Sequence, residues 1–187
     1  LKQGVEMRSL GMLKFESGDK ETPELFEDIY KAGFLMLFFG LESANDRILK
    51  IIDKGCDQDT ERSVLRNSSN AGIWNHLYLF FGFPTEEREE AEDTIQFTVE
   101  NSEVGTGTIH SVGQSIFALE KDSAIYHNPG KFKIDRIIHN PDRDMAIVFD
   151  FDIEAGMPRD EVMEVYEHFN SVIEETFPSR NIWNYLS

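Results

Sequence analysis

The sequence has a single cysteine, Cys56, among its 187 residues. One thiol cannot form a disulfide within the chain, and it cannot by itself supply a cysteine-rich zinc or iron–sulfur site. No histidine lies at a metal-ligand spacing from Cys56, so we interpret it as an ordinary thiol and expect no metal site built from this chain alone.

Long apolar runs and an excess of positive charge are also missing. No apolar run approaches the ~20 residues that a membrane-spanning helix requires. The 35 acidic residues outnumber the 18 basic ones, and the resulting net charge of -17 repels phosphate backbones and anionic membranes. We therefore expect a cytoplasmic protein that binds neither nucleic acid nor membrane. The start at Leu1, with neither an initiator methionine nor a signal-peptide pattern, suggests a piece of a longer protein.

The tetrapeptide Leu-Phe-Phe-Gly occurs twice, at 37–40 and 79–82, and polar residues follow each copy closely. The first copy lies in the apolar run 34–41 and the second near the end of the run 73–83. Such runs are typical of parallel strands that are covered on both faces. Functional side chains of α/β enzymes gather at the carboxyl ends of such strands.

Helical patterns separate the predicted strands. Thr22 and Pro23 mark the start of one helix, and Gly33 is placed to end it. The other predicted elements are strands at 10–16, 106–119 and 145–152, and helices from a Ser43–Asp46 capping box to Gly55, at 58–71, from Glu86 and from Pro158. This alternation predicts a parallel sheet, either doubly wound or part of a barrel.

The regular alternation covers residues 1–120. Turn-rich sequence between 121 and 143 predicts an irregular C-terminal extension over 121–187 that ends in a long amphipathic helix. The acidic run 86–90 begins a helix, where negative charge is stabilising, and we interpret it as a solvated face.

Four short motifs occur in order along the chain: Phe39-Gly-Leu-Glu-Ser43, Lys54-Gly55, Ala71-Gly72 and Gly82-Phe-Pro-Thr-Glu86. Together they resemble the radical SAM superfamily. More narrowly, they resemble the later half of the barrel of radical SAM Fe-S oxidoreductases, including those with an upstream cobalamin-binding domain. The resemblance covers roughly residues 10–130 and implies an α/β fold: a partial TIM-like (β/α) barrel with parallel strands, followed by the helical extension.

The resemblance also implies a parent enzyme that uses a 4Fe-4S cluster to cleave S-adenosylmethionine (SAM) to a 5′-deoxyadenosyl radical. In that family a CxxxCxxC motif holds the cluster, and this chain has no such triplet. We therefore expect this chain to be inactive alone, to hold neither cofactor by itself, and to need the missing N-terminal half of the barrel as its partner. The small-molecule substrate stays unassigned.

Two site residues follow from the resemblance. Glu42 matches an acid or amide that helps to organise the SAM site, and Lys54 matches a basic position that can meet the methionyl carboxylate. The alternatives are that Glu42 interacts with the dipole of the next helix and that Lys54 is a solvated lysine near a helix end.

Alternation along the two Leu-Phe-Phe-Gly strands places Glu42, His76 and Tyr78 on one side, which we expect to line the barrel lumen. Gln114, on the next predicted strand, is a further lumen candidate. A lone histidine in a strand is more often a satisfied interior residue, and no catalytic residue is assigned.

Other interpretations remain open. The chain has Leu119-Glu-Lys-Asp-Ser123 where relatives often have a Pro-Gly-Thr or Pro-Gly-Ser turn near the adenine. The pattern would also fit a non-radical α/β enzyme, a sugar-binding or other small-molecule-binding domain, or a non-catalytic interaction module.

A half barrel has an unpaired sheet edge, from which we expect a homo-oligomer.

Overall fold

The computed structural model of the chain describes residues 8–15, 22–139 and 147–177. Its elements are β1 (Ser9–Leu13), α1 (Pro23–Lys31), β2 (Phe34–Glu42), α2 (Asp46–Ile51), α3 (Gln58–Asn70), β3 (Trp74–Phe81), α4 (Arg88–Asn101), β4 (Ser111–Ile116), β5 (Leu119–Glu120), α5 (Ala124–His127), the 3-10 helix η1 (Pro129–Phe132), β6 (Ile134–Ile138), β7 (Val148–Ile153) and α6 (Arg159–Thr176). Within these residues no helix is long and apolar enough to cross a membrane.

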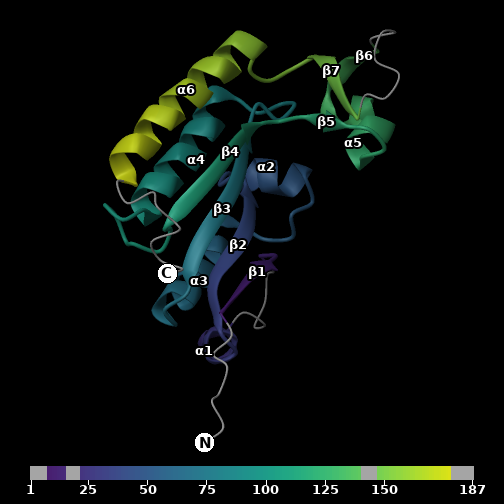
Figure 1. The fold of residues 1–187 in the computed structure, drawn as a ribbon. Helices are drawn as coiled ribbons and strands as arrows, with labels where there is room; N and C mark the ends of the chain where they lie inside the picture. The colour runs from purple at the N-terminus through teal and green to yellow at the C-terminus, as the bar shows by residue number, and fades with distance from the viewer. Residues whose placement is uncertain (1–7, 16–21, 140–146, 178–187) are drawn as a thin grey trace, which may run out of the picture.

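The first four strands form one parallel sheet in the order β1-β2-β3-β4 (Figure 1). A doubly wound sheet reverses its strand order at a switch point, whereas a barrel adds each new strand beside the last. The spatial order here equals the chain order, so the structure confirms the α/β class and favours the partial barrel over the doubly wound alternative.

Local sequence signals set the helix starts. The Thr22 hydroxyl accepts the Leu25 N–H at 3.3 Å and Pro23 follows as the first residue of α1, as predicted. The start of α2 differs from the expected capping box, because its N-cap is Asn45, whose side chain accepts the N–H groups of Arg47 and Ile48.

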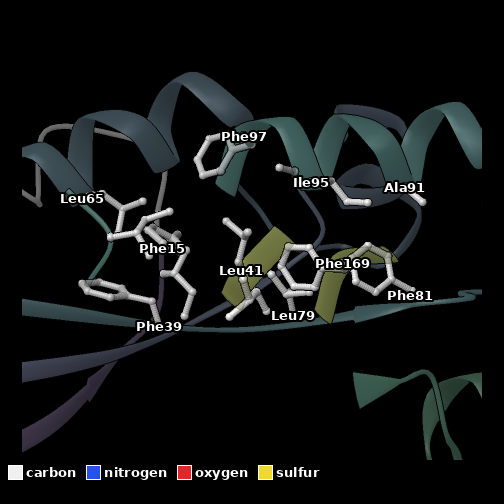
Figure 2. Packing of buried hydrophobic residues seen from close by; sticks show 14 of the residues in the cluster. Phe15, Phe39, Leu41, Leu65, Leu79, Phe81, Ala91, Ile95, Phe97 and Phe169 are labelled. Atoms are coloured by element: carbon white, nitrogen blue, oxygen red, sulfur yellow. The ribbon is translucent and has the colours of Figure 1, made fainter. Parts of the chain in front are cut away.

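The main hydrophobic core lies between the sheet and the helices α1, α3, α4 and α6, on the side that we call the helix face. Figure 2 shows Phe39, Leu41, Leu79 and Phe81 of β2 and β3 beneath side chains of α3, α4 and α6. Each of these four strand residues is at most 2% exposed, and full burial of one such side chain contributes about 1.5–3 kcal/mol.

The opposite side of the sheet, which we call the open face, carries the alternate residues of the same strands. Phe38 of β2 lies against His76 and Tyr78 of β3 on this side. Met12 of β1 is in register with Phe38 and is 82% exposed. The open face is therefore less covered than the helix face at this end of the sheet.

The segment after β4 is more regular than the sequence predicted. Strands β5, β7 and β6 form a small antiparallel sheet beside α5 and η1. Phe132 of η1 packs into a second apolar cluster with Ile48 of α2 and Phe83. This small subregion is thereby joined to the ends of the strands that carry the motifs.

Helix α6 packs on the helix face together with α4 (Figure 1). Its stripe of Val162, Val165, Phe169 and Ile173 is at most 5% exposed and belongs to the main core. From the sequence pattern, this helix was expected to belong to a C-terminal extension that starts at residue 121. Its stripe packs against core residues of the first 120 residues.

We predict that Phe169→Ala lowers the free energy of unfolding by about 3–5 kcal/mol, because a fully buried phenylalanine is replaced by a cavity. His168→Ala, at the neighbouring exposed position, should change it by less than about 0.5 kcal/mol. Urea denaturation followed by circular dichroism measures both. Equal effects would contradict the placement of α6 in the core.

Candidate functional site

An ion pair joins Glu42 and Lys54, the two residues that the sequence resemblance singled out. Glu42 is the last residue of β2, and Lys54 follows α2. The Lys54 ammonium donates to Glu42 Oε1 at 3.2 Å, and the side chains of Lys54 and Glu42 are 11% and 32% exposed. The structure therefore brings both predicted residues together at the carboxyl end of a parallel strand.

The backbone at this point is irregular. The register between β2 and β3 shifts after Gly40, so that Gly40 lies opposite Tyr78 and Glu42 lies opposite Leu79. Glu42 itself has a φ of 66°, in the left-handed region that residues with a Cβ rarely adopt. Such strain persists only where surrounding contacts enforce it, and it is concentrated at functional sites.

Gly40 makes room for the ion pair. A Cβ at this position would overlap the Glu42 carboxylate and would lie 3.1 Å from Lys54 Nζ. The glycine thus leaves a cradle on the open face that the two charged groups occupy. Gly40 does not have a positive φ, so glycine is required here by the lack of space for a Cβ and not by the backbone conformation.

His76 and Tyr78 lie together on the open face, as the alternation predicted. Their ring centroids are 4.7 Å apart, and the Tyr78 ring stacks on Phe38 with centroids at 6.0 Å and an interplanar angle of 15°. His76 Nδ1 and Ser111 Oγ are 2.7 Å apart. Burial lowers the pKa of His76 to about 4, so its imidazole is neutral at pH 7.

Tyr78 is 45% exposed and lies beside Gly113 of β4. A Cβ at Gly113 would approach the Tyr78 ring to 3.1 Å and His76 Nε2 to 3.2 Å. The glycine lets the two side chains lie close to the sheet. Together with Phe38 they form an aromatic surface that is partly open to ligands.

Gln114 does not join this surface. In the β3–β4 register it lies opposite Leu79, a core residue of the helix face, whereas Gly113 lies opposite Tyr78. Its amide donates to the Asn170 side chain of α6. The structure therefore places Gln114 away from the lumen, unlike the sequence-based expectation, because alternation shows which residues share a side but not which side faces the helices.

Glu86 departs from the predicted solvated acidic run. It is 0% exposed, and its Oε2 accepts the Gly82 N–H at 2.6 Å, closing the loop after β3. Its Oε1 has no hydrogen-bond partner among the described residues. Burial raises the pKa of Glu86 to about 7, and the backbone hydrogen bonds only partly oppose this shift.

The sequence contains a capping box that separates Glu86 from the rest of the acidic run, although the run looks uniform. Glu87 and Glu90 form the capping box of α4, so the helix starts after Glu86 and leaves this residue in the loop. A carboxylate within such a loop can satisfy the free N–H groups at a strand end, as it does here for Gly82.

Arg47 of α2 connects the ends of β2 and β3. It pairs with Glu90 of α4, and its Nη2 donates to the Thr85 carbonyl at 2.6 Å. Thr85 has a φ of 79°, so a second strained residue sits in a motif loop. These contacts fix the loop after β3 relative to the helix that precedes Lys54.

The described residues offer no group of ligands for an iron–sulfur cluster. In the described part of the chain no group of three or more histidine, cysteine, aspartate or glutamate side chains could hold a metal ion. Cys56 lies 3.7 Å from Oε1 of the buried Glu61, and burial raises the pKa of both groups. The thiol is therefore protonated at neutral pH, whereas a metal ligand is a thiolate.

Residues 8–98 match the model of the Radical SAM superfamily. A 67-residue alignment gives 36% identity to an uncharacterised methyltransferase of Pyrococcus horikoshii and covers 36% of this chain and 15% of the relative. The family match runs from β1 into α4 and so includes Glu42 and Lys54. Over this stretch, just under half of its length, the chain is similar to the Radical SAM superfamily.

Two solved structures share the fold. Coproporphyrinogen III oxidase of Escherichia coli, described as a radical SAM enzyme, aligns over 90% of this chain with a TM-score of 0.64 and 10% identity. An Elp3 of Methanocaldococcus infernus aligns over 87% of this chain with a TM-score of 0.54 and 12% identity. The alignments span 32% and 41% of those proteins, so this chain corresponds to less than half of either.

We predict a pH signature for Glu86. The unfolded chain loses this proton near pH 4.5, whereas the folded chain keeps it until about pH 7. Ionisation therefore disfavours the folded state progressively between these pH values and by a constant amount above them. Glu86→Gln cannot ionise, so its free energy of unfolding relative to the native chain should rise by roughly 3 kcal/mol from pH 4.5 to pH 7.5.

Urea denaturation at several pH values measures this difference. Glu89→Gln is the matched control, because Glu89 lies on the exposed side of the same run. A flat difference for Glu86→Gln, indistinguishable from that of the control, would show that Glu86 ionises normally in the folded chain.

Proposed function

We propose that this chain is the later half of the barrel of a radical SAM Fe-S oxidoreductase. In this proposal Glu42 and Lys54 bind the amino-acid end of SAM, and His76 and Tyr78 line the lumen beside the substrate. The observation that carries the proposal is the Glu42–Lys54 pair, held over Gly40 at the carboxyl end of β2.

The pair is complementary to the ligand. The methionyl end of SAM has one ammonium and one carboxylate, so Glu42 can accept from the ammonium while Lys54 donates to the carboxylate. Each protein group would exchange its present partner for a ligand group of the same charge. Partly exposed ion pairs contribute only about 0–1 kcal/mol, so this exchange gives up little stability.

The cluster belongs to another part of the parent protein. The described residues do not fit it, since they offer one protonated thiol and no metal-binding group. In the parent, SAM and the cluster would supply the 5′-deoxyadenosyl radical. The residues of this chain would hold the amino-acid end of SAM and shape the space beside it.

The unpaired edge of the sheet at β1 supports the proposal that an upstream barrel half is missing. Strand β1 pairs with β2 and has no second neighbour among the described strands. Leu10 and Met12 of β1 are 47% and 82% exposed on the open face. An upstream barrel half would pair with this edge and cover these side chains, and without it two copies of this chain could associate through the same edge.

His76 and Tyr78 have different roles in this proposal. The neutral imidazole of His76 is fixed through Nδ1 by Ser111, so it can offer Nε2 to a ligand without introducing a charge. Tyr78 offers an exposed ring face and a hydroxyl. Both groups orient a ligand and exclude water.

We predict that Glu42→Gln and Lys54→Ala each weaken SAM binding to the intact parent protein by about tenfold, equivalent to about 1.4 kcal/mol. Equilibrium dialysis with labelled SAM measures this. Lys50→Ala is the control, because Lys50 is an exposed lysine of the same helix region. Unchanged affinity in both site variants would remove these residues from the SAM site.

The parent gene provides a separate test. Its sequence upstream of Leu1 should encode a CxxxCxxC motif. Absence of that motif from the whole parent protein would contradict radical SAM chemistry, whatever Glu42 and Lys54 bind.

A further inference from the structure

A cavity of about 700 Å³ lies where the small antiparallel sheet meets the main domain. Its walls come from the ends of β3 and β4, from β6 and β7, and from the start of α6. Figure 1 shows the small sheet at the same end of the main sheet as the start of α6. The volume falls within the range of roughly 300–1,000 Å³ that small-molecule sites occupy.

The walls are mostly apolar. Their large side chains include Ile116, Phe117, Phe151, Met157 and Val162. Met157 and Val162 are at most 5% exposed. A ligand with an apolar body would therefore find a preformed surface, and its transfer from water would be favourable.

This cavity is separate from the proposed SAM site. Glu42, Lys54, His76 and Tyr78 are not among its lining residues. Its floor includes Gly82, at the end of β3, where a Cβ would come within 2.6 Å of Val162 Cγ1. The cavity thus approaches the motif loop from the side of α6.

Three charged residues line the walls: Asp150 and Asp152 of β7 and Arg159 of α6. Arg136 neutralises Asp152 through a hydrogen bond of 3.0 Å from Nε and an ion pair of 2.5 Å from Nη2. Asp150 and Arg159 have no ion-pair partner in the described part of the chain.

Asp150 and Arg159 differ in what they indicate about a ligand. With 35 acidic and 18 basic residues, unpaired carboxylates follow from number alone, so Asp150 indicates little. Arg159, exposed in the first turn of α6, is the only basic residue among those that line the cavity. Arg159 offers a planar donor fork that matches a carboxylate.

We propose that this cavity binds a small molecule with an apolar body and one carboxylate, and that the carboxylate pairs with Arg159. The apolar walls hold the body, and the guanidinium selects the anionic end. The ligand is bound and oriented here, and no covalent step is involved.

Decanoate, decanol and decylammonium test this proposal, because each has a ten-carbon skeleton and their head groups are anionic, neutral and cationic, respectively. Isothermal titration calorimetry on the chain of residues 1–187 should show that decanoate binds at least tenfold more tightly than the other two probes. Arg159→Gln should reduce the decanoate affinity to that of decanol. The matched control Arg66→Gln, at an exposed position of α3, should leave it unchanged.

Ala118→Trp should abolish binding by filling the cavity from an exposed wall position, and Val148→Trp serves if the first variant does not fold. Circular dichroism checks the fold of each variant. Four results would overturn the proposal: no decanoate binding, equal affinity for decanoate and decanol, tighter binding of decylammonium, or full binding by a folded cavity-filling variant. The last would place the probe elsewhere, for example on the open face.

Discussion

The alternation of side chains along β2 and β3 couples the hydrophobic core of this protein to its candidate site. Burial of the core requires four strand residues to face the helices: Phe39, Leu41, Leu79 and Phe81. Because side chains alternate along a strand, the residues between them must point to the open face. Phe38, His76 and Tyr78 are thereby presented on the open face. A slip of one residue would expose the core and bury the polar groups, so the energy of core packing also holds the site in register.

The strand ends depart from regular structure, and the departures are held by specific contacts. Glu42 and Thr85 both have positive φ values, one in each motif loop. Gly40 leaves space for the Glu42–Lys54 pair, and the carboxylate of the buried Glu86 closes the loop after β3. Arg47 then joins the two regions through Thr85 and Glu90. The candidate site therefore lies at strand ends that are held in place by these contacts. The stability of the hydrophobic core offsets the cost of the strained backbone and of the buried Glu86 side chain.

Much of this arrangement could be predicted from the sequence, because it rests on periodicity and local signals. The strands around the Leu-Phe-Phe-Gly repeats, the start of α1 and the shared side of His76 and Tyr78 are of this kind. The position of Gln114 could not be predicted, since alternation leaves the choice of face open until the packing of α6 is known. The burial of Glu86 and the bulge before Glu42 depend on loop contacts between segments that are distant in the sequence. The resemblance to the radical SAM superfamily pointed to Glu42 and Lys54, whereas only the structure showed that the two side chains meet.

The proposed function depends above all on the Glu42–Lys54 pair as the receiver of the amino-acid end of SAM. A crystal structure of the intact parent protein, with its cluster reconstituted and SAM bound, tests this role most directly. We expect Glu42 to lie within hydrogen-bond distance of the methionyl ammonium and Lys54 within hydrogen-bond distance of the methionyl carboxylate. SAM bound elsewhere, with the 3.2 Å bond between Lys54 and Glu42 intact, would contradict this role.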